Sequence, residues 1–163
     1  MKKIAFTLLL SGLLTNTALA ASANSTNSVG INYSFDDAFG AQFEFDISKA
    51  VNNKPVSVQL FWKNYSQRLG TNNTWNTTGV GAAGIYDLTS VSKLDKKFHP
   101  YVGLGLISES HSWAGFGGQQ NYTGVNGGLY IIGGVRYNLN PQITADVNLN
   151  SFGGLTVGAN FNF

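Results

Sequence analysis

The sequence contains no cysteine among its 163 residues, and only 11% of the residues are charged. Without cysteine the chain has no disulfide framework, no thiolate metal site and no cysteine nucleophile. The charged fraction is far below the ~25% of ordinary soluble domains, so little charge is available to cover a surface that faces water. Two lysines near the N-terminus account for the formal net charge of +2. The rest of the chain is therefore neutral and has no general electrostatic affinity for nucleic acid.

Long apolar runs are also missing. The apolar stretch over residues 4–14 is too short for a membrane-spanning helix, which needs ~20 residues. Lysines precede it and an Ala-Leu-Ala site ending at Ala20 follows it, which is the pattern of a secretory signal peptide. An uncleaved N-terminal anchor is the alternative. The expected division of the chain is a removed signal peptide at 1–20, a short disordered lead at 21–27 and one folded domain at 28–163.

The rest of the chain alternates apolar and polar residues, a pattern typical of β-strands whose two faces meet different surroundings. The last nine residues, LTVGANFNF, place an apolar residue at every second position. Two places depart from the pattern, because Phe61 falls on a polar face and LYII at residues 129–132 is apolar on both faces. The alternating runs are residues 29–36, 39–48, 56–63, 79–88, 101–109, 127–139, 143–150 and 155–163. They predict eight strands and no helix.

The composition of the polar face indicates what that face meets. On a soluble sheet it would be rich in Lys, Glu and Arg, but here it is mainly Gly, Asn, Ser, Thr and Gln. Small polar groups suit the narrow interior of a closed eight-stranded barrel, and runs of about nine to eleven residues are long enough to cross a bilayer as tilted strands. We predict an all-β fold, an eight-stranded antiparallel up-and-down transmembrane β-barrel with its apolar face toward lipid. Because eight is even, both termini are expected on the periplasmic side, with loops 64–79 and 108–127 outside.

The C-terminal phenylalanine and the alternating residues before it resemble the assembly signal of bacterial outer-membrane barrels. Together with PYVGLGL (100–106) and GGVRYNLNPQITADVNL (133–149), they resemble the OmpA/OmpX-like superfamily of small barrels over residues 28–163. The resemblance implies a monomer embedded in outer-membrane lipid, with the barrel assembly machinery and periplasmic chaperones as partners. The residues of the implied assembly signal are Leu155, Val157, Ala159, Phe161 and Phe163.

Charged residues on the polar face are predicted to line the lumen. They are Glu44, Asp46, Lys63, Asp87, Glu109, Arg136 and Asp146. Lone buried charges are costly, so charges of both signs inside a narrow barrel are expected to pair. We favour a network of salt bridges that fills the lumen, with Asp146 or Glu44 as the partner of Arg136. An ion path or gate is the alternative.

The two histidines are weighed as catalytic or metal-binding groups. His111 shares a strand face with Glu109, but the neighbouring serines lie on the opposite face, so a nucleophile and its base do not meet. Outer-membrane lipid A deacylases carry a His-x-Ser pair, and neither His111 nor His99 is followed by one. A metal site formed by both histidines is discounted because they fall at opposite ends of the same predicted strand.

The sequence therefore predicts a barrel with a filled polar lumen that is not an enzyme and has no cofactor or metal. Its expected role is structural or surface-interactive, through loops 64–79 and 108–127 and an unknown extracellular ligand. A small ion or solute channel of the porin kind is the first alternative. A lipid-modifying enzyme of the outer membrane is the second.

Overall fold

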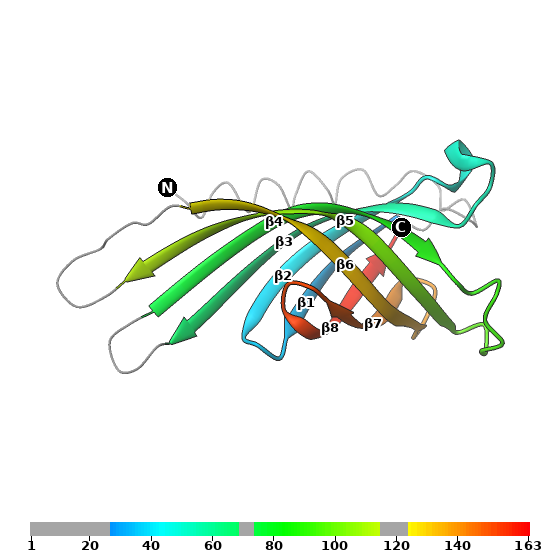
Figure 1. Ribbon diagram of the computed structural model, residues 1–163. Coiled ribbons are helices and arrows are strands. Elements are labelled where there is room, and N and C mark those ends of the chain that lie inside the picture. The colour runs from blue at the N-terminus through cyan, green and yellow to red at the C-terminus, as the bar shows by residue number, and fades with distance from the viewer. Residues whose placement is uncertain (1–26, 69–73, 115–123) are drawn as a thin grey trace.

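The computed structural model describes residues 27–68, 74–114 and 124–163, and these form one closed antiparallel barrel. Each strand is hydrogen-bonded to the next along the chain, and the last strand pairs with the first (Figure 1). The strands are β1 (Ser28–Ser34), β2 (Ala38–Asp46), β3 (Val56–Arg68), β4 (Thr74–Asp87), β5 (Phe98–Ala114), β6 (Gly124–Asn138), β7 (Ile143–Asn150) and β8 (Gly154–Asn162). The predicted eight-stranded up-and-down barrel is confirmed. The predicted signal peptide and the lead up to residue 26 lie outside the described residues.

A short 3-10 helix, η1 (Ser48–Val51), lies in the connection between β2 and β3. The sequence had predicted no helix there. Within the part of the chain that the structure describes, no helix has both the length and the apolar character needed to cross a membrane.

The loops predicted at 64–79 and 108–127 are largely strand, which corrects the sequence-based boundaries. β3 continues to Arg68 and β4 begins at Thr74, while β5 continues to Ala114 and β6 begins at Gly124. Polar residues on both faces made these segments look like loops, but β3 pairs with β4 and β5 pairs with β6 along them, which satisfies the backbone groups on the paired sides. Figure 1 shows β3–β6 reaching well past the tight turns that join β1 to β2 and β7 to β8.

Those tight turns end the short strands early. Asp37 takes a left-handed conformation with φ 62° between β1 and β2, and the Tyr33 hydroxyl donates a 2.7 Å hydrogen bond to its carboxylate. Between β7 and β8, Gly153 and Gly154 have φ values of 142° and 60°. Glycine adopts such angles without a steric penalty, so the chain can reverse within a few residues. We call this end of the barrel the loop end and the opposite end, where β1 starts and β8 finishes, the terminal end.

The side chains alternate between the two faces as predicted, and the apolar face is the outer one, which is the opposite of a soluble barrel. Apolar side chains point outward, and Leu104 and Leu106 are 59% and 70% exposed. Polar side chains point inward, and Ser34 and Thr156 are completely buried. A wall of exposed apolar residues around a polar interior is suited to lipid, because there the surrounding medium is itself apolar.

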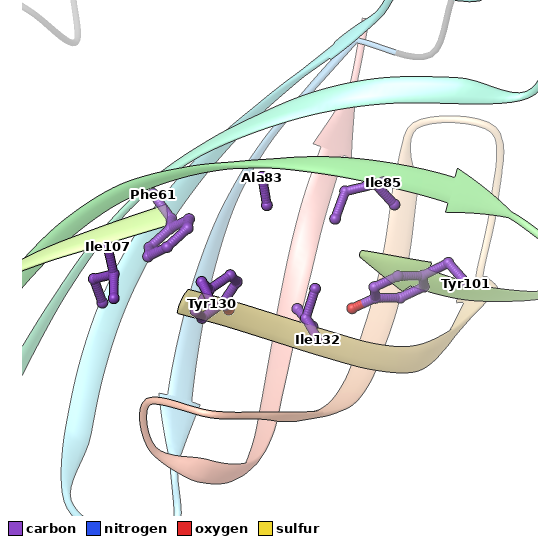
Figure 2. Packing of buried hydrophobic residues seen from close by; sticks show 7 residues of the cluster. All are labelled: Phe61, Ala83, Ile85, Tyr101, Ile107, Tyr130 and Ile132. Carbon is purple, nitrogen blue, oxygen red and sulfur yellow. The ribbon is translucent and has the colours of Figure 1, made fainter. Parts of the chain in front are cut away.

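The interior has two halves of different chemistry. The half formed by β1, β2, β7 and β8 is polar, as predicted, with buried Asn32, Gln42, Thr144, Asn148, Asn150, Thr156 and Asn160. The half formed by β3–β6 contains a buried apolar cluster, which we call the β3–β6 cluster (Figure 2). Its members are Phe61, Ala83, Ile85, Tyr101, Ile107, Tyr130 and Ile132. The predicted polar lumen is therefore only partly correct in this half, where buried Gln59, Lys63 and Thr77 accompany the apolar cluster.

Glycines on the inner face make room for the large side chains of the β3–β6 cluster. A Cβ added to Gly81 would overlap the Phe61 ring, and one added to Gly103 would lie 2.7 Å from Ile132. Small and large residues thus complement one another across the narrow lumen, as in other small barrels. The two departures from alternation, Phe61 and residues 129–132, supply inward aromatic and aliphatic groups to this cluster.

The barrel closes through a full seam between β1 and β8. The register runs from Ser28 opposite Asn162 to Ser34 opposite Thr156. Beyond the seam, the Phe163 backbone N–H donates a 2.9 Å hydrogen bond to the carbonyl of Asn27. Where each strand pairs on both sides, closure leaves no free edge, whose unpaired backbone groups lipid could not satisfy. Beyond that region the projecting residues 124–131 of β6 pair with β5 alone.

Candidate functional site

The lumen is crossed by an ion pair centred on Arg136 of β6. Its Nη1 and Nη2 atoms donate hydrogen bonds of 2.9 and 2.6 Å to the two carboxylate oxygens of Glu44 on β2. Its Nε atom lies 3.9 Å from Asp146 of β7, and both carboxylates are buried. A two-pronged guanidinium–carboxylate pair fixes geometry as well as charge. Both residues that the sequence offered as partners of Arg136 thus lie beside it.

Tyr101 of β5 completes this group. Its ring lies 4.3 Å from the guanidinium carbon of Arg136, and its hydroxyl donates to the Asp146 carboxylate at 2.9 and 3.1 Å. The ring thus stacks on the cation while its hydroxyl satisfies the anion. Sequence reasoning placed Tyr101 on the inner face but did not single it out. We call Glu44, Tyr101, Arg136 and Asp146 the Arg136 cluster.

Neutral side chains extend this pairing through the polar half of the lumen. Ser34 and Thr156 share a hydrogen bond of 2.6 Å between their hydroxyl groups, and the Asn150 amide donates to Thr156 at 2.9 Å. The Asn32 amide donates to Gln42, which in turn donates to Asn160, at 3.1 and 2.8 Å. Few buried polar groups in this half therefore lack a partner, as stability inside a protein requires. The alternation placed these residues inward but did not show which of them would pair.

Lys63 of β3 lies apart from the Arg136 cluster. It is 2% exposed, its Nζ lies 5.7 Å from the centre of the Tyr130 ring, and within the described residues it forms no ion pair. Close to it along β3, the Gln59 side-chain amide is buried and makes no hydrogen bond to the protein. Fewer of the buried polar side chains around Lys63 and Gln59 therefore have hydrogen-bond or ion-pair partners than those around Arg136.

The terminal end of the lumen holds a cavity of about 170 Å³ beneath the Arg136 cluster, lined in part by Asp46 and Asp87. Asp46 accepts the backbone N–H of Ser48 at 2.7 Å, and Asp87 accepts that of Thr89 at 2.6 Å. These two carboxylates thus hold the neighbouring turns. The His99 Nδ1 atom lies 3.4 Å from the second oxygen of Asp87.

Glu109 of β5, the last of the predicted lumen acids, lies at the loop end. The His111 Nε2 atom lies 3.6 Å from the Glu109 carboxylate, and its Nδ1 atom shares a 2.8 Å hydrogen bond with the Thr77 hydroxyl. His99 and His111 lie near opposite ends of β5, as expected. Across residues 27–68, 74–114 and 124–163, no group of three or more His, Cys, Asp or Glu side chains could hold a metal ion.

The seven predicted lumen charges therefore divide by level. Three of them, Glu44, Arg136 and Asp146, meet in one cluster. The remaining four are spread along the barrel: Asp46 and Asp87 at the terminal end, Lys63 at an intermediate level and Glu109 at the loop end. Their shared inward face was readable from the sequence, but their level along the axis depends on the stagger between strands.

A closed barrel of eight antiparallel strands, apolar outside and largely polar within, defines a small integral protein of the bacterial outer membrane. A family model described as "Opacity family porin protein" matches residues 31–162, and the chain belongs to that family. No curated protein sequence matches the chain.

Solved structures of other outer-membrane proteins share this fold. The N-terminal β-barrel domain of Pseudomonas aeruginosa OprF is 18% identical, with a TM-score of 0.61 over 86% of this chain and 98% of that one. Neisserial surface protein A is 17% identical, with a TM-score of 0.59 over 85% and 94%. The attachment invasion locus protein Ail of Yersinia pestis is 13% identical, with a TM-score of 0.52 over 85% and 97%. The predicted fold, superfamily and outer-membrane location are confirmed.

Proposed function

We propose that this protein is a surface-interaction barrel with a closed lumen, which meets its partner at the loop end. The observation that carries the proposal is the unequal length of the strands, because β3–β6 project beyond the turns of the other four strands (Figure 1). In outer-membrane barrels the short turns face the periplasm and the long connections face outside. By that rule the projecting segments face the medium and both termini face the periplasm.

On the projecting parts of β3, β4 and β5, the outer face changes from apolar to polar along the strand. On β3, exposed Trp62 is followed by outward Asn64 and Ser66, and on β5 the exposed Leu106 is followed by outward Ser108 and Ser112. Outward groups on neighbouring strands also bond to each other, as the Asn64 amide does to the Thr78 hydroxyl at 2.9 Å. A polar outer face is suited to water rather than lipid. Residues 64–79 and 108–127 are therefore proposed to stand above the membrane, within reach of a partner.

Charge at the two ends bears on the kind of partner. One solved structure of Ail contains the heparin analogue sucrose octasulfate, a polyanion. In the present chain the acids of the loop end, Asp36, Asp37 and Glu109, outnumber its one arginine, Arg68, and no lysine lies there among the described residues. The described lysines in connections lie at the terminal end instead, and they are Lys49, Lys54, Lys93, Lys96 and Lys97. This distribution favours a partner other than a polyanion.

A channel is the second candidate, and the filling of the lumen weighs against it. The Arg136 cluster spans the interior at one level, and Phe61 and Tyr130 pack with ring centres 4.2 Å apart at another. We expect the purified barrel in planar bilayers to show no stable conductance steps. Steady single-channel conductance in the wild-type protein would favour the channel over a closed barrel.

We also propose that the chain is not an enzyme and that it works as a monomer after removal of residues 1–20. The alternating residues of β8 are proposed to be read by the barrel assembly machinery, with periplasmic chaperones holding the chain before that step. In the barrel these five side chains, Leu155, Val157, Ala159, Phe161 and Phe163, are exposed on the outer face. Exposure on one face leaves them accessible to a recognising protein.

Cysteine labelling tests the direction of the barrel, because the chain has no cysteine of its own. Ser112→Cys places a thiol on the outer face of the projection, and Lys96→Cys places one in the connection between β4 and β5. In intact cells a membrane-impermeant maleimide is expected to label Ser112→Cys alone. After lysis it is expected to label both variants. The reverse pattern in intact cells would place the termini outside and remove the basis of the proposal.

Shortening one projecting hairpin tests the surface role itself. Lys63 pairs with Gly79, so replacing residues 64–78 by Asn-Gly joins β3 and β4 with a two-residue turn at the level of the lipid boundary. Cells that carry this variant should hold a normal amount of folded barrel and lose attachment to surfaces that the wild-type protein binds. Undiminished attachment would contradict a role for this segment.

A further inference from the structure

The loop end of the lumen contains a cavity that is separate from the Arg136 cluster. It has a volume of about 230 Å³ and opens between the β1–β2 turn, the projecting strands and the β7–β8 turn. Its lining includes Asp36, Tyr65, Thr77, Glu109, His111 and Phe152. We call it the mouth pocket. Five different elements of the barrel supply these residues, so the pocket exists only in the closed fold.

Phe152 forms the floor of the mouth pocket. It comes from the β7–β8 turn and packs against the buried β3–β6 cluster. A Cβ added to Gly79 would lie 3.0 Å from the ring of Phe152, so this ring rests directly on the inner wall. The backbone N–H of Phe152 also donates to the Asn150 side chain at 3.1 Å, which fixes the base of the turn. The pocket therefore has an apolar surface where Phe152 lines it.

The wall on β4 and β5 is held by a chain of contacts. The Trp75 Nε1–H donates to the Thr77 hydroxyl at 3.0 Å, and the Trp75 and His111 rings lie 5.8 Å apart between centres. In the tautomer with hydrogen on Nε2, the Thr77 hydroxyl donates to His111 Nδ1 and the Nε2–H points toward Glu109. These contacts hold the His111 ring in place beside the Glu109 carboxylate before any ligand arrives, and such preorganisation lowers the entropic cost of binding.

Among the residues that the structure describes, both formally charged lining residues are acids, and they come from opposite sides of the pocket. Asp36 belongs to the β1–β2 turn and Glu109 belongs to β5. Lys63, the nearest described basic residue along β3, reaches the Tyr130 ring deeper in the lumen. The mouth pocket thus combines two carboxylates with the aromatic rings of Tyr65 and Phe152. Carboxylates attract a cation directly, and aromatic faces attract it through their quadrupoles while also accepting an apolar body.

We propose that the mouth pocket binds a small organic cation, with an ammonium group between Asp36 and Glu109 and an apolar body against Tyr65 and Phe152. The proposal rests on the proposed function for the direction in which the pocket opens. The ligand chemistry itself depends only on the lining residues. Because these residues lie on the inner side of the wall, the ligand arrives from the aqueous medium.

Calorimetric titration of the purified, folded barrel tests the ligand class. Phenethylammonium is the probe, and 2-phenylethanol is its neutral counterpart of nearly the same shape. Maltoside micelles are used because their headgroup carries no ammonium group that would compete. We expect the wild-type protein to bind the cation at least tenfold more tightly than the alcohol. Equal binding of the two probes, or no binding of the cation at millimolar concentration, would overturn the proposal.

Variants locate the site. Asp36→Asn together with Glu109→Gln should weaken phenethylammonium at least tenfold and leave the weak binding of the alcohol unchanged. Asp95→Asn, a change of the same kind in the β4–β5 connection, should leave both affinities as in the wild type. Phe152→Ala should weaken both probes, because it removes the apolar floor. Unchanged cation affinity in the double variant would mean that the two carboxylates do not form the site.

The titration and the labelling experiment separate the two proposals. If the barrel binds the cation but Ser112→Cys is labelled only after lysis, the direction of the barrel is wrong and the ligand chemistry stands. If Ser112→Cys is labelled in intact cells but the cation does not bind, the surface role stands and the mouth pocket is not a cation site.

Discussion

The two halves of the barrel share one outer face but differ inside. β1, β2, β7 and β8 are 7 to 9 residues long and enclose a hydrogen-bonded polar interior. β3–β6 are 13 to 17 residues long and enclose a cluster of aromatic and aliphatic side chains together with a few polar groups such as Lys63. Lipid constrains the outer face all the way round, so both halves are apolar there. The interior only has to be filled and paired, and this chain fills it in two different ways.

The polar and apolar side chains that fill the two halves of the lumen should respond differently to mutation. In the polar half, removing one partner strands another polar group in a buried place, so the cost depends on pairing. In the apolar half, removing atoms leaves a cavity, so the cost depends on volume. This contrast can be tested with variants, each measured as a shift in the urea unfolding midpoint of the barrel in lipid vesicles.

Arg136→Ala should have the largest effect. It leaves the buried carboxylates of Glu44 and Asp146 without their cation, and breaking a buried pair in this way costs about 3–5 kcal/mol. The midpoint should fall accordingly. An unchanged midpoint would show that the Arg136 cluster does not hold the lumen together.

A double variant, Arg136→Ala with Glu44→Gln, serves as the control. Neutralising Glu44 removes one stranded charge, so part of the lost stability should return. If the double variant loses more unfolding free energy than the two single variants lose together, the Glu44 carboxylate is not stranded by the loss of Arg136.

Arginine on the outer face tests whether the two halves meet the same lipid. Val157→Arg on β8 and Leu104→Arg on β5 should each cost about 2–4 kcal/mol if these positions lie deep in the bilayer. Ser112→Arg, also on the outer face of β5 but in the projection, should cost close to nothing. If Val157→Arg folds as well as Ser112→Arg does, the apolar face does not meet lipid and a soluble barrel becomes the better description.

Thr156→Val tests the polar interior with little change of shape. The hydroxyl of Thr156 bonds to Ser34 and Asn150, so the valine leaves both of them short of a partner at a cost of about 1–3 kcal/mol. Thr156→Ser is the matched control, because it keeps the hydroxyl group. Equal midpoints for Thr156→Val and the wild type would mean that pairing contributes little in this half.

Ile132→Val should have the smallest effect. It removes one methylene from the β3–β6 cluster, where the expected cost is about 0.5–1.5 kcal/mol. No polar group loses a partner, so the loss should follow the removed volume alone. A greater loss for Ile132→Val than for Thr156→Val would reverse the contrast between the two halves.

Alternation in the sequence was sufficient to predict the strands and which face of each points inward. It also brought Glu44, Arg136 and Asp146 into one candidate set, because a shared inward face is a local property of each strand. The contacts within that set could not be derived, since they depend on how far each strand is displaced along its neighbour. The role of Tyr101 was missed for the same reason.

Two further features escaped prediction for other physical reasons. The extensions of β3, β4 and β5 are polar on their outer faces, as expected of segments proposed to stand above the lipid boundary, so the usual strand signal fades although the backbone pairing continues. The apolar half of the interior was signalled by Phe61 and residues 129–132, which looked like exceptions. The mouth pocket joins Asp36 with Glu109 and Phe152, which are too far apart in sequence for any local pattern to connect.

The seam between β1 and β8 has a consequence for the time course of folding. Its partners, such as Ser28 and Asn162, belong to the first and last strands of the barrel, so the seam closes the longest loop that the domain contains. Contacts between distant segments form slowly, because their entropic cost precedes their stabilisation. A seven-stranded intermediate would expose two unpaired edges and would have no closed lumen in which Glu44 and Arg136 could meet. The ion pair should therefore appear late, and its formation should report the moment at which the barrel closes.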